Sequence, residues 1–95
     1  MKQNLYAIYD EKTMAYNRPF LFPNDEAAQR AMVDLIANPD NDIAKHPEDY
    51  LIFAIGKYSD ETGNISDTEQ HRLLFRFSDL AIKVTDHAQL NEARV

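Results

Sequence analysis

Residues 50–58 read Tyr-Leu-Ile-Phe-Ala-Ile-Gly-Lys-Tyr, and this stretch contains the longest unbroken run of apolar residues in the chain. When it is drawn as an extended strand, apolar side chains project to both sides, because successive side chains alternate between the two faces. Strands that are apolar on both faces are typical of the buried interior of a sheet. The stretch therefore predicts a central strand that is covered on both faces.

Two other segments predict neighbouring strands. Residues 4–10 contain Leu-Tyr-Ala-Ile-Tyr, which is rich in β-branched and aromatic side chains. Residues 20–22, Phe-Leu-Phe, lie between two prolines, and because proline cannot donate to a strand ladder this strand is short or lies at an edge. We expect these two segments to pair with each other in the antiparallel direction.

The second half of the chain predicts a hairpin and one more strand. Residues 60–64, Asp-Glu-Thr-Gly-Asn, are typical turn residues, and Ile65 can return beside the central strand. Residues 72–77 read Arg-Leu-Leu-Phe-Arg-Phe. Their alternation predicts an apolar face and a mixed basic face that Arg72 shares with Arg76.

One amphipathic helix is predicted at residues 25–37. Asn24 and Asp25 are favoured at helix N-termini, and apolar residues then repeat with helical spacing from Ala28 to Leu35. Asn38-Pro39 ends the helix, since a residue that precedes proline avoids the helical region. Residues 39–49 predict a charged loop with a single helical turn near 42–45.

These elements predict an α+β fold with an antiparallel sheet of about four strands, in the order strand-strand-helix-strand-strand, and one main helix on one face. A chain of 95 residues fits a single domain, residues 1–95, whose tail at 79–95 is irregular or forms a short helix capped by Asp86. Because one helix covers only one face, the tail, a ligand or a second copy must cover the other. Two-fold association is the commonest solution, so we expect a homodimer.

Composition narrows the class of protein. The chain lacks cysteine, which excludes disulfides, thiolate metal sites and cysteine nucleophiles and fits a reducing compartment. Neither a signal peptide nor a membrane-spanning pattern is visible, so we expect a soluble cytoplasmic protein. The net charge of −6 weighs against binding to phosphate backbones. A local basic face can nevertheless act within a Debye length of about 8 Å.

The familiar signatures of enzymes and metal sites are absent from the sequence. Only two glycines occur, so there is no glycine-rich phosphate loop. The three histidines, His46, His71 and His87, are too widely separated to suggest a zinc site. The acidic residues of the loop at 40–49 do not have EF-hand spacing, since Lys45 stands where that loop needs glycine. We therefore expect no catalytic residue, no metal and no cofactor.

The sequence also contains a weak pattern for nucleic-acid binding, because aromatic and basic residues occur next to one another in it. Single strands are bound by aromatic faces that stack on bases and by cations that contact phosphates. The candidate nucleic-acid-binding residues are Arg18, Lys57, Tyr58, Arg72 and Arg76. The alternative is that the phenylalanines form the core and the cations only keep the surface soluble.

Several segments resemble a known viral family. They are Asp-Ile-Ala-Lys-His-Pro-Glu-Asp-Tyr at 42–50, Ile-Gly-Lys-Tyr-Ser-Asp at 55–60, Arg-Pro-Phe at 18–20 and Ala-Gln-Arg-Ala at 28–31. Over about residues 5 to 66 the chain resembles the small nonstructural protein of gokushoviruses, which are microviruses with single-stranded DNA. The resemblance implies a protein of the viral DNA cycle in the cytoplasm of a bacterial host.

Two functions are consistent with these observations. The first is a phage nonstructural protein that binds single-stranded DNA during genome replication or packaging. The second is a non-enzymatic interaction module that regulates a viral or host replication protein, through the acidic loop or the uncovered sheet face. Charge placement distinguishes them: cations that share one face favour DNA, whereas scattered cations beside an exposed apolar patch favour a protein partner.

Overall fold

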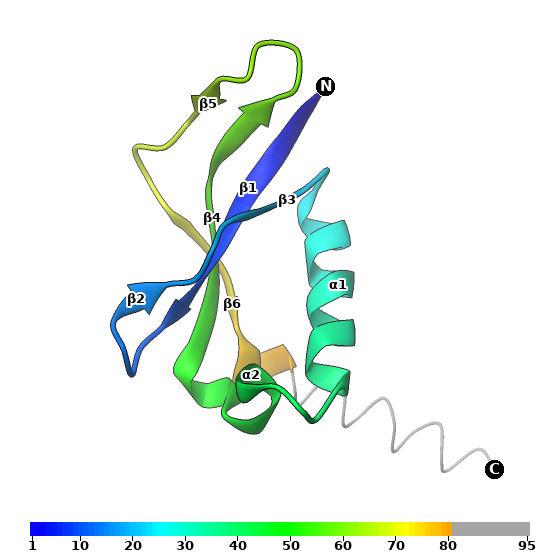
Figure 1. Ribbon diagram of the computed structural model, residues 1–95, viewed down its shortest axis with the longest axis vertical. Helices are drawn as coiled ribbons and strands as arrows, with labels where there is room; N and C mark the ends of the chain where they lie inside the picture. Colours follow the sequence, from blue (N-terminus) through cyan, green and yellow to red (C-terminus); the bar gives the residue numbers. More distant parts are fainter. Residues whose placement is uncertain (81–95) are drawn as a thin grey trace, which may run out of the picture.

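The computed structural model describes residues 1–80 and confirms the α+β class (Figure 1). The predicted short helix capped by Asp86 lies outside the described residues. Residues 77–80 form a helical turn. In chain order the elements are β1 (Lys2–Asp10), β2 (Ala15–Tyr16), β3 (Phe20–Phe22), α1 (Asp25–Ala37), α2 (Asp42–Lys45), the 3₁₀ turn η1 (Pro47–Asp49), β4 (Tyr50–Ser59), β5 (Ile65–Ser66) and β6 (Arg72–Arg76).

The sheet is built around one long antiparallel pair, β1 with β4. Their register runs from Lys2↔Ser59 to Asp10↔Tyr50. On the outer side of β1 lie β2 and β3, and on the outer side of β4 lie β5 and β6. The predicted pairing of residues 4–10 with 20–22 is confirmed, as is the central position of residues 50–58.

Within residues 1–80 the sheet has six strands, where the sequence predicted about four. The two additional strands, β2 and β5, are each only two residues long. The pattern predicted Ile65 beside β4 but carried no sign of β2. A two-residue pairing is too short to produce an alternating pattern, which explains why β2 was missed.

Helix α1 begins and ends where the sequence predicted. The side chain of Asn24 accepts a hydrogen bond of 2.8 Å from the backbone N–H of Ala27 and so caps the first turn. After the helix, the side chain of Asn41 donates to the carbonyl of Leu35 and accepts from the N–H of Ala44, each at 2.8 Å. This asparagine therefore joins α1 to the predicted helical turn α2.

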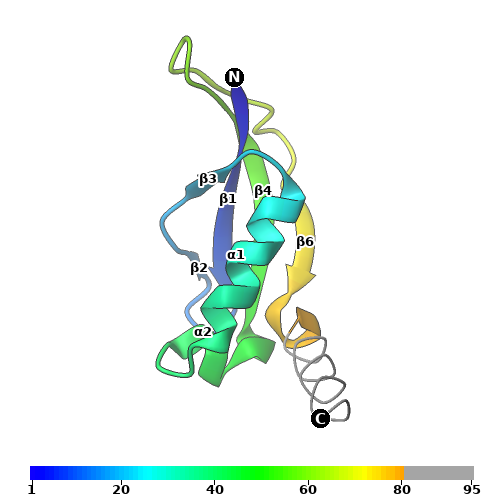
Figure 2. The same ribbon diagram turned by 90° about the vertical axis from the view of Figure 1, so that its right-hand side faces the viewer.

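The core lies between α1 and one face of the sheet (Figure 2). Tyr6, Ile52 and Phe77 are its largest fully buried side chains. Ala28 and Met32 bring the apolar side of α1 against them. Within residues 1–80 no helix packs over the other face, so the prediction of a strand covered on both faces is fulfilled on one face only.

A β-bulge corrects the prediction for β6. Phe53 pairs with Leu73 while Ile52 pairs with Phe75, so Leu74 is an additional residue in β6. The strict alternation is broken there. Leu73 and Phe75, which an unbroken alternation would place on one face, therefore lie on opposite faces of the sheet. Arg72 and Arg76 therefore lie on opposite faces of the sheet and do not share one. Phe77 belongs to the helical turn and is buried in the core.

Candidate functional site

The face of the sheet opposite α1, which we call the open face, carries the exposed apolar side chains of the described chain. The register places Tyr16 beside Tyr9, Leu21 beside Leu5, Ile65 beside Tyr58 and Leu73 beside Phe53, all on this face. Apart from Met1, the large apolar side chains that are at least about a third exposed are, with their exposed fractions, Met14 (77%), Ile65 (57%), Leu73 (50%), Tyr16 (47%) and Leu21 (37%). An apolar surface of this kind is typical of a binding site.

A groove of about 400 Å³ crosses the end of the open face near the β1–β2 turn. Its floor is formed by Leu51 and Phe53 of β4, and its walls by Tyr9, Glu11, Met14 and Tyr16. The turn is fixed by the Asp10 carbonyl, which accepts from the Met14 N–H at 2.8 Å. Met14 adopts a positive φ of 57°, which is uncommon for a residue with a side chain. The turn therefore holds Met14 beside the groove at a conformational cost.

Tyr16 is the centre of an aromatic cluster on the open face. Its ring centroid lies 4.8 Å from that of Tyr9, 6.0 Å from that of Phe53 and 5.8 Å from that of His71, in edge-on geometries. Its hydroxyl lies 3.4 Å from Nδ1 of His71. The cluster offers ring faces, apolar contact and a hydrogen-bonding hydroxyl to a bound partner.

The cation at the margin of the groove is already paired. Arg76 forms an ion pair with Glu11, and its Nη1 donates to the backbone carbonyl of Glu48 at 2.7 Å. Glu11 thus neutralises the arginine that could otherwise attract phosphate. The open face is consequently apolar and aromatic rather than basic.

Comparison with known protein families gives a match over most of the chain. The family model described as Phage ORF5 protein matches residues 3–80, which contain α1 and all of the sheet except Lys2 at the start of β1. The chain belongs to the Phage ORF5 protein family. No curated protein and no solved structure matches it. It is therefore a phage protein, and the family description itself names no activity.

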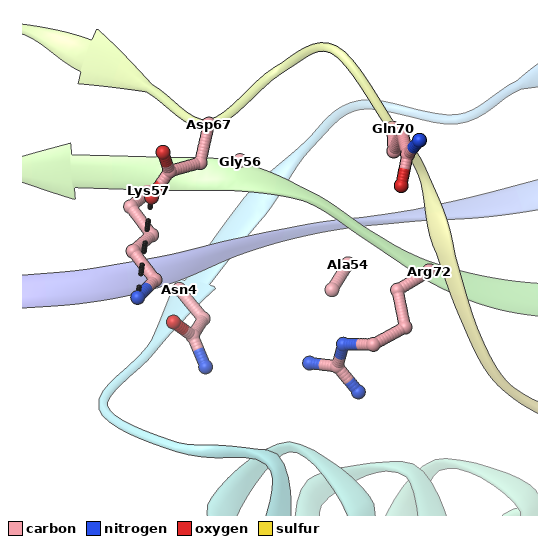
Figure 3. Close-up of a pocket in the computed structure, with 7 residues that line it drawn as sticks. All are labelled: Asn4, Ala54, Gly56, Lys57, Asp67, Gln70 and Arg72. Atoms are coloured by element: carbon pink, nitrogen blue, oxygen red, sulfur yellow. Dashed lines mark ion pairs between the residues drawn. The ribbon is translucent and has the colours of Figure 1, made fainter.

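In this member of the Phage ORF5 protein family, the five predicted nucleic-acid-binding residues do not form one surface. Lys57 and Arg72 line a second, smaller pocket on the same side of the sheet as α1 (Figure 3). Tyr58 and Arg76 lie on the open face. Arg18 is exposed in the connection between β2 and β3, next to the edge of β1. The predicted site is thus divided between two faces and an edge.

The helix-side pocket has a volume of about 130 Å³ and holds as much negative as positive charge in its surroundings. Lys57 lies 4.0 Å from Asp67, and Arg72 Nη1 lies 2.9 Å from Asp25 at the start of α1. Asn4 and Gln70 complete the polar lining. Both cations therefore have carboxylate partners, which reduces their attraction for a phosphate group.

Asp25 joins β1, β6 and α1 through one carboxylate. It accepts hydrogen bonds from the hydroxyl of buried Tyr6 at 2.6 Å and from Arg72 Nη2 at 3.1 Å. The hydrogen bond from Arg72 lowers the pKa of Asp25, and the bond from Tyr6 acts in the same direction. Burial, followed by the hydrogen bond to Asp25, raises the pKa of Tyr6 to about 12. This network therefore favours a charged Asp25 and a neutral Tyr6 in the folded protein.

Sequence reasoning missed most residues of the open-face groove. The alternation at residues 5–9 and 50–58 did signal a second apolar face, and with it Tyr9, Leu51 and Phe53 could have been assigned to that face. Tyr16 and Met14 gave no such signal, because they belong to a turn and a two-residue strand.

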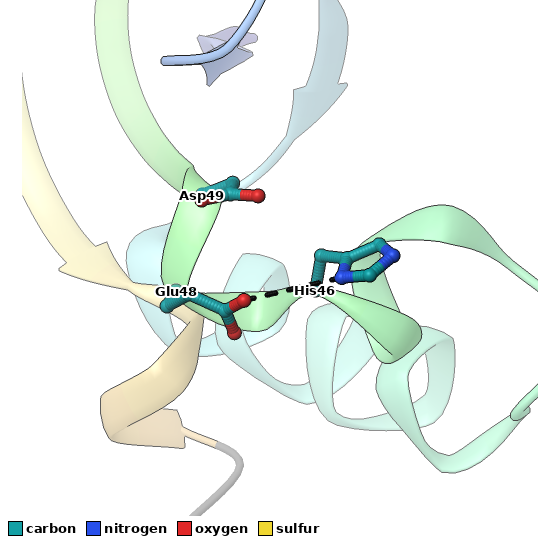
Figure 4. A group of neighbouring side chains, drawn as sticks. All are labelled: His46, Glu48 and Asp49. Atoms are coloured by element: carbon teal, nitrogen blue, oxygen red, sulfur yellow. Dashed lines mark ion pairs between the residues drawn. The ribbon is translucent and has the colours of Figure 1, made fainter.

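Two further observations concern metals and membranes. Within residues 1–80, His46, Glu48 and Asp49 are the group of possible metal ligands whose donor atoms lie within 4.8 Å of one another (Figure 4). The helices of residues 1–80 include none with the length and hydropathy needed to cross a bilayer.

Proposed function

We propose that this phage protein is a non-enzymatic interaction module whose open face binds another protein of the viral DNA cycle. The observation that carries the proposal is the segregation of exposed apolar side chains on the open face, while the predicted cations are scattered and three of them, Lys57, Arg72 and Arg76, are paired with carboxylates. Interface centres are depleted in charged residues and enriched in aromatic residues and methionine, as this face is.

The groove indicates the chemistry of the partner. Tyr9, Met14 and Phe53 form an apolar pocket that suits an aromatic or aliphatic anchor side chain. Glu11 at its margin is paired with Arg76, but the chain as a whole carries a charge of −6. The partner that fits is therefore a protein segment with apolar anchors and basic flanking residues. In a gokushovirus-type phage, such a partner would be a viral or host replication protein in the host cytoplasm.

Site-specific photocrosslinking in phage-infected cells tests this proposal. A photoreactive phenylalanine analogue replaces Tyr16 or Leu73 on the open face, and Arg30, exposed on α1, serves as the control position. We expect both open-face positions to crosslink to the same replication protein, and the control position to fail. Crosslinks only to a second copy would support the predicted homodimer instead. Equal crosslinking from all three positions would contradict a specific open-face site.

Single-stranded DNA is the second candidate ligand, and the Tyr9, Tyr16 and Phe53 cluster is the observation that favours it. Exposed rings on a sheet are typical stacking platforms for bases, and each lost stack costs about 1–3 kcal/mol. Arg76 and His71 lie beside the cluster, and Arg76 would contact a phosphate by exchanging its ion pair with Glu11 for one with the DNA backbone. This arrangement places three rings and an arginine on one face, whereas the predicted set of five residues is divided between two faces and an edge.

Fluorescence anisotropy of a labelled single-stranded oligonucleotide at two salt concentrations, with a duplex control, tests the DNA alternative. If DNA is the ligand, Tyr16→Ser should weaken saturable binding by roughly tenfold or more. Arg76→Gln should also reduce the salt dependence, whereas Arg30→Gln, which removes the same charge from α1, should change neither. Absence of binding at high micromolar protein in low salt would exclude this candidate and leave the protein partner.

A further inference from the structure

The turn that contains His46, Glu48 and Asp49 places an imidazole and two carboxylates side by side. Nδ1 of His46 lies 3.9 Å from Oε1 of Glu48, and the donor atoms of all three residues lie within 4.8 Å of one another. Figure 4 shows the His46 ring and the Glu48 carboxylate facing each other along the turn. The open-face proposal does not involve this group of side chains.

The geometry points to a binding site for a divalent first-row transition metal of the Zn²⁺ type, and we propose that these three residues are its ligands. At metal–ligand distances of about 2.0–2.2 Å, two donors on a tetrahedral ion are about 3.3–3.6 Å apart. The donors of the turn need to approach one another by less than about 2 Å to reach these separations. His46 and Glu48 are more than half exposed, so side-chain rotation can supply this movement.

The backbone that carries the three ligands is already fixed. The N–H of His46 donates to the Asp42 carbonyl at 2.9 Å, and the N–H of Asp49 donates to the His46 carbonyl at 3.0 Å. Pro47 begins the 3₁₀ turn, which restricts the backbone further. A metal ion would therefore order side chains on a turn that already exists, which reduces the entropic cost of binding.

Contacts from the sheet hold the same turn from outside. The Glu48 carbonyl accepts from Arg76 of β6 at 2.7 Å, and the Asp49 carbonyl accepts from the N–H of Glu11 at 2.9 Å. Both hydrogen bonds are accepted by backbone carbonyls, so the carboxylates of Glu48 and Asp49 take no part in them. The backbone of the turn is thus held by Arg76 of β6 and by Glu11, which follows β1, and these two hydrogen bonds do not occupy the ligand side chains.

The set of donors selects the type of metal. Calcium and magnesium prefer oxygen ligands alone, whereas imidazole combined with carboxylate suits zinc and its neighbours in the first transition row. The two carboxylates supply negative charge, and residues 38–70 hold the acidic excess of the chain. Three protein ligands leave at least one position on the ion for water or for a donor from a bound partner.

Isothermal titration of the tag-free full chain with Zn²⁺, together with the visible spectrum of the Co²⁺ complex, tests the site. We expect one ion per chain, and at least tenfold weaker binding in both His46→Gln and Glu48→Gln. Two matched controls, His71→Gln and Glu69→Gln, remove another histidine and another acidic residue and should leave the affinity for the metal unchanged. Far-UV circular dichroism of each variant shows whether the fold is retained.

Each alternative outcome overturns the proposal. No saturable binding at millimolar Zn²⁺ excludes the site. Binding that His46→Gln leaves unchanged, or that the two control variants weaken equally, would mean that the ion is held by scattered surface groups. The metal titration does not involve Tyr16 or Leu73, so a failure to bind metal leaves the proposed function of the open face untouched. A failure of the crosslinking experiment likewise leaves the proposed metal site untouched.

Discussion

The two faces of β4 have similar apolar composition but different environments. Ile52 and Ala54 point toward α1 and are buried, whereas Leu51 and Phe53 alternate with them and remain partly exposed on the open face. Nothing in the composition of the strand distinguishes the two sets. The difference arises because one helix can cover only one side of a sheet. The covered face therefore stabilises the fold, while the open face keeps its apolar surface available for binding.

Adjacent substitutions in β4 should show the largest difference between the faces. Ile52→Ala removes fully buried methyl groups and should lower the free energy of unfolding by about 3 kcal/mol. Leu51→Ala, on the half-buried open face, should cost about 1 kcal/mol. Urea unfolding followed by circular dichroism measures both values. Equal losses would show that the open face is covered in solution by the tail or by a second copy.

The hydroxyl of Tyr6 should have the next largest effect. Tyr6→Phe keeps the buried ring but removes the 2.6 Å hydrogen bond to Asp25, which should cost about 1–2 kcal/mol. Tyr9→Phe is the matched change on the open face and should stay within about 0.5 kcal/mol. If both variants unfold at the urea concentration of the wild type, the Asp25 network contributes little to the covered face.

Acid should weaken the covered face through Asp25. The folded-state pKa of this carboxyl is lowered, chiefly by Arg72, so its contribution to stability is present above the unfolded pKa of about 3.9 and is lost as the pH falls through the folded value. Because the side chain of Asp25 is 45% exposed, we expect a modest effect. Urea midpoints between pH 7 and pH 2 should fall less steeply in Asp25→Asn than in the wild type. Parallel curves would rule out this role.

The comparison of faces also shows how far the sequence alone could lead. Helix α1 was predicted with its observed bounds because Asn24, the apolar repeat and Pro39 are all local signals. The bulge at Leu74 is not a local signal, because it depends on how β6 pairs with β4. Without it, Arg72 and Arg76 were assigned to one basic face, and the predicted DNA-binding set followed from that assignment.

The candidate groove was less accessible to sequence reasoning than the fold. Its floor, Leu51 and Phe53, was visible in the pattern that is apolar on both faces, whereas what covers that face stays a prediction. Its walls depend on Tyr16, which reaches the groove only because the β1–β2 turn folds back onto Tyr9. The proximity of His46 to Glu48 likewise results from a tertiary setting of the turn that spacing alone does not specify.

The smallest expected effect belongs to Leu73, and it tests the comparison most directly. Leu73 is half exposed beside Phe53, so Leu73→Ser removes apolar surface that an isolated chain leaves in contact with water. The free energy of unfolding should change by no more than about 0.5 kcal/mol, in contrast to Ile52→Ala. The same variant should nevertheless lose the crosslink formed from position 16, because the apolar surface would be interrupted beside the groove. Urea unfolding of the wild type and of Leu73→Ser is measured at several protein concentrations. If Leu73→Ser loses much stability, and the loss grows with protein concentration, the open face is already buried between two copies of the chain.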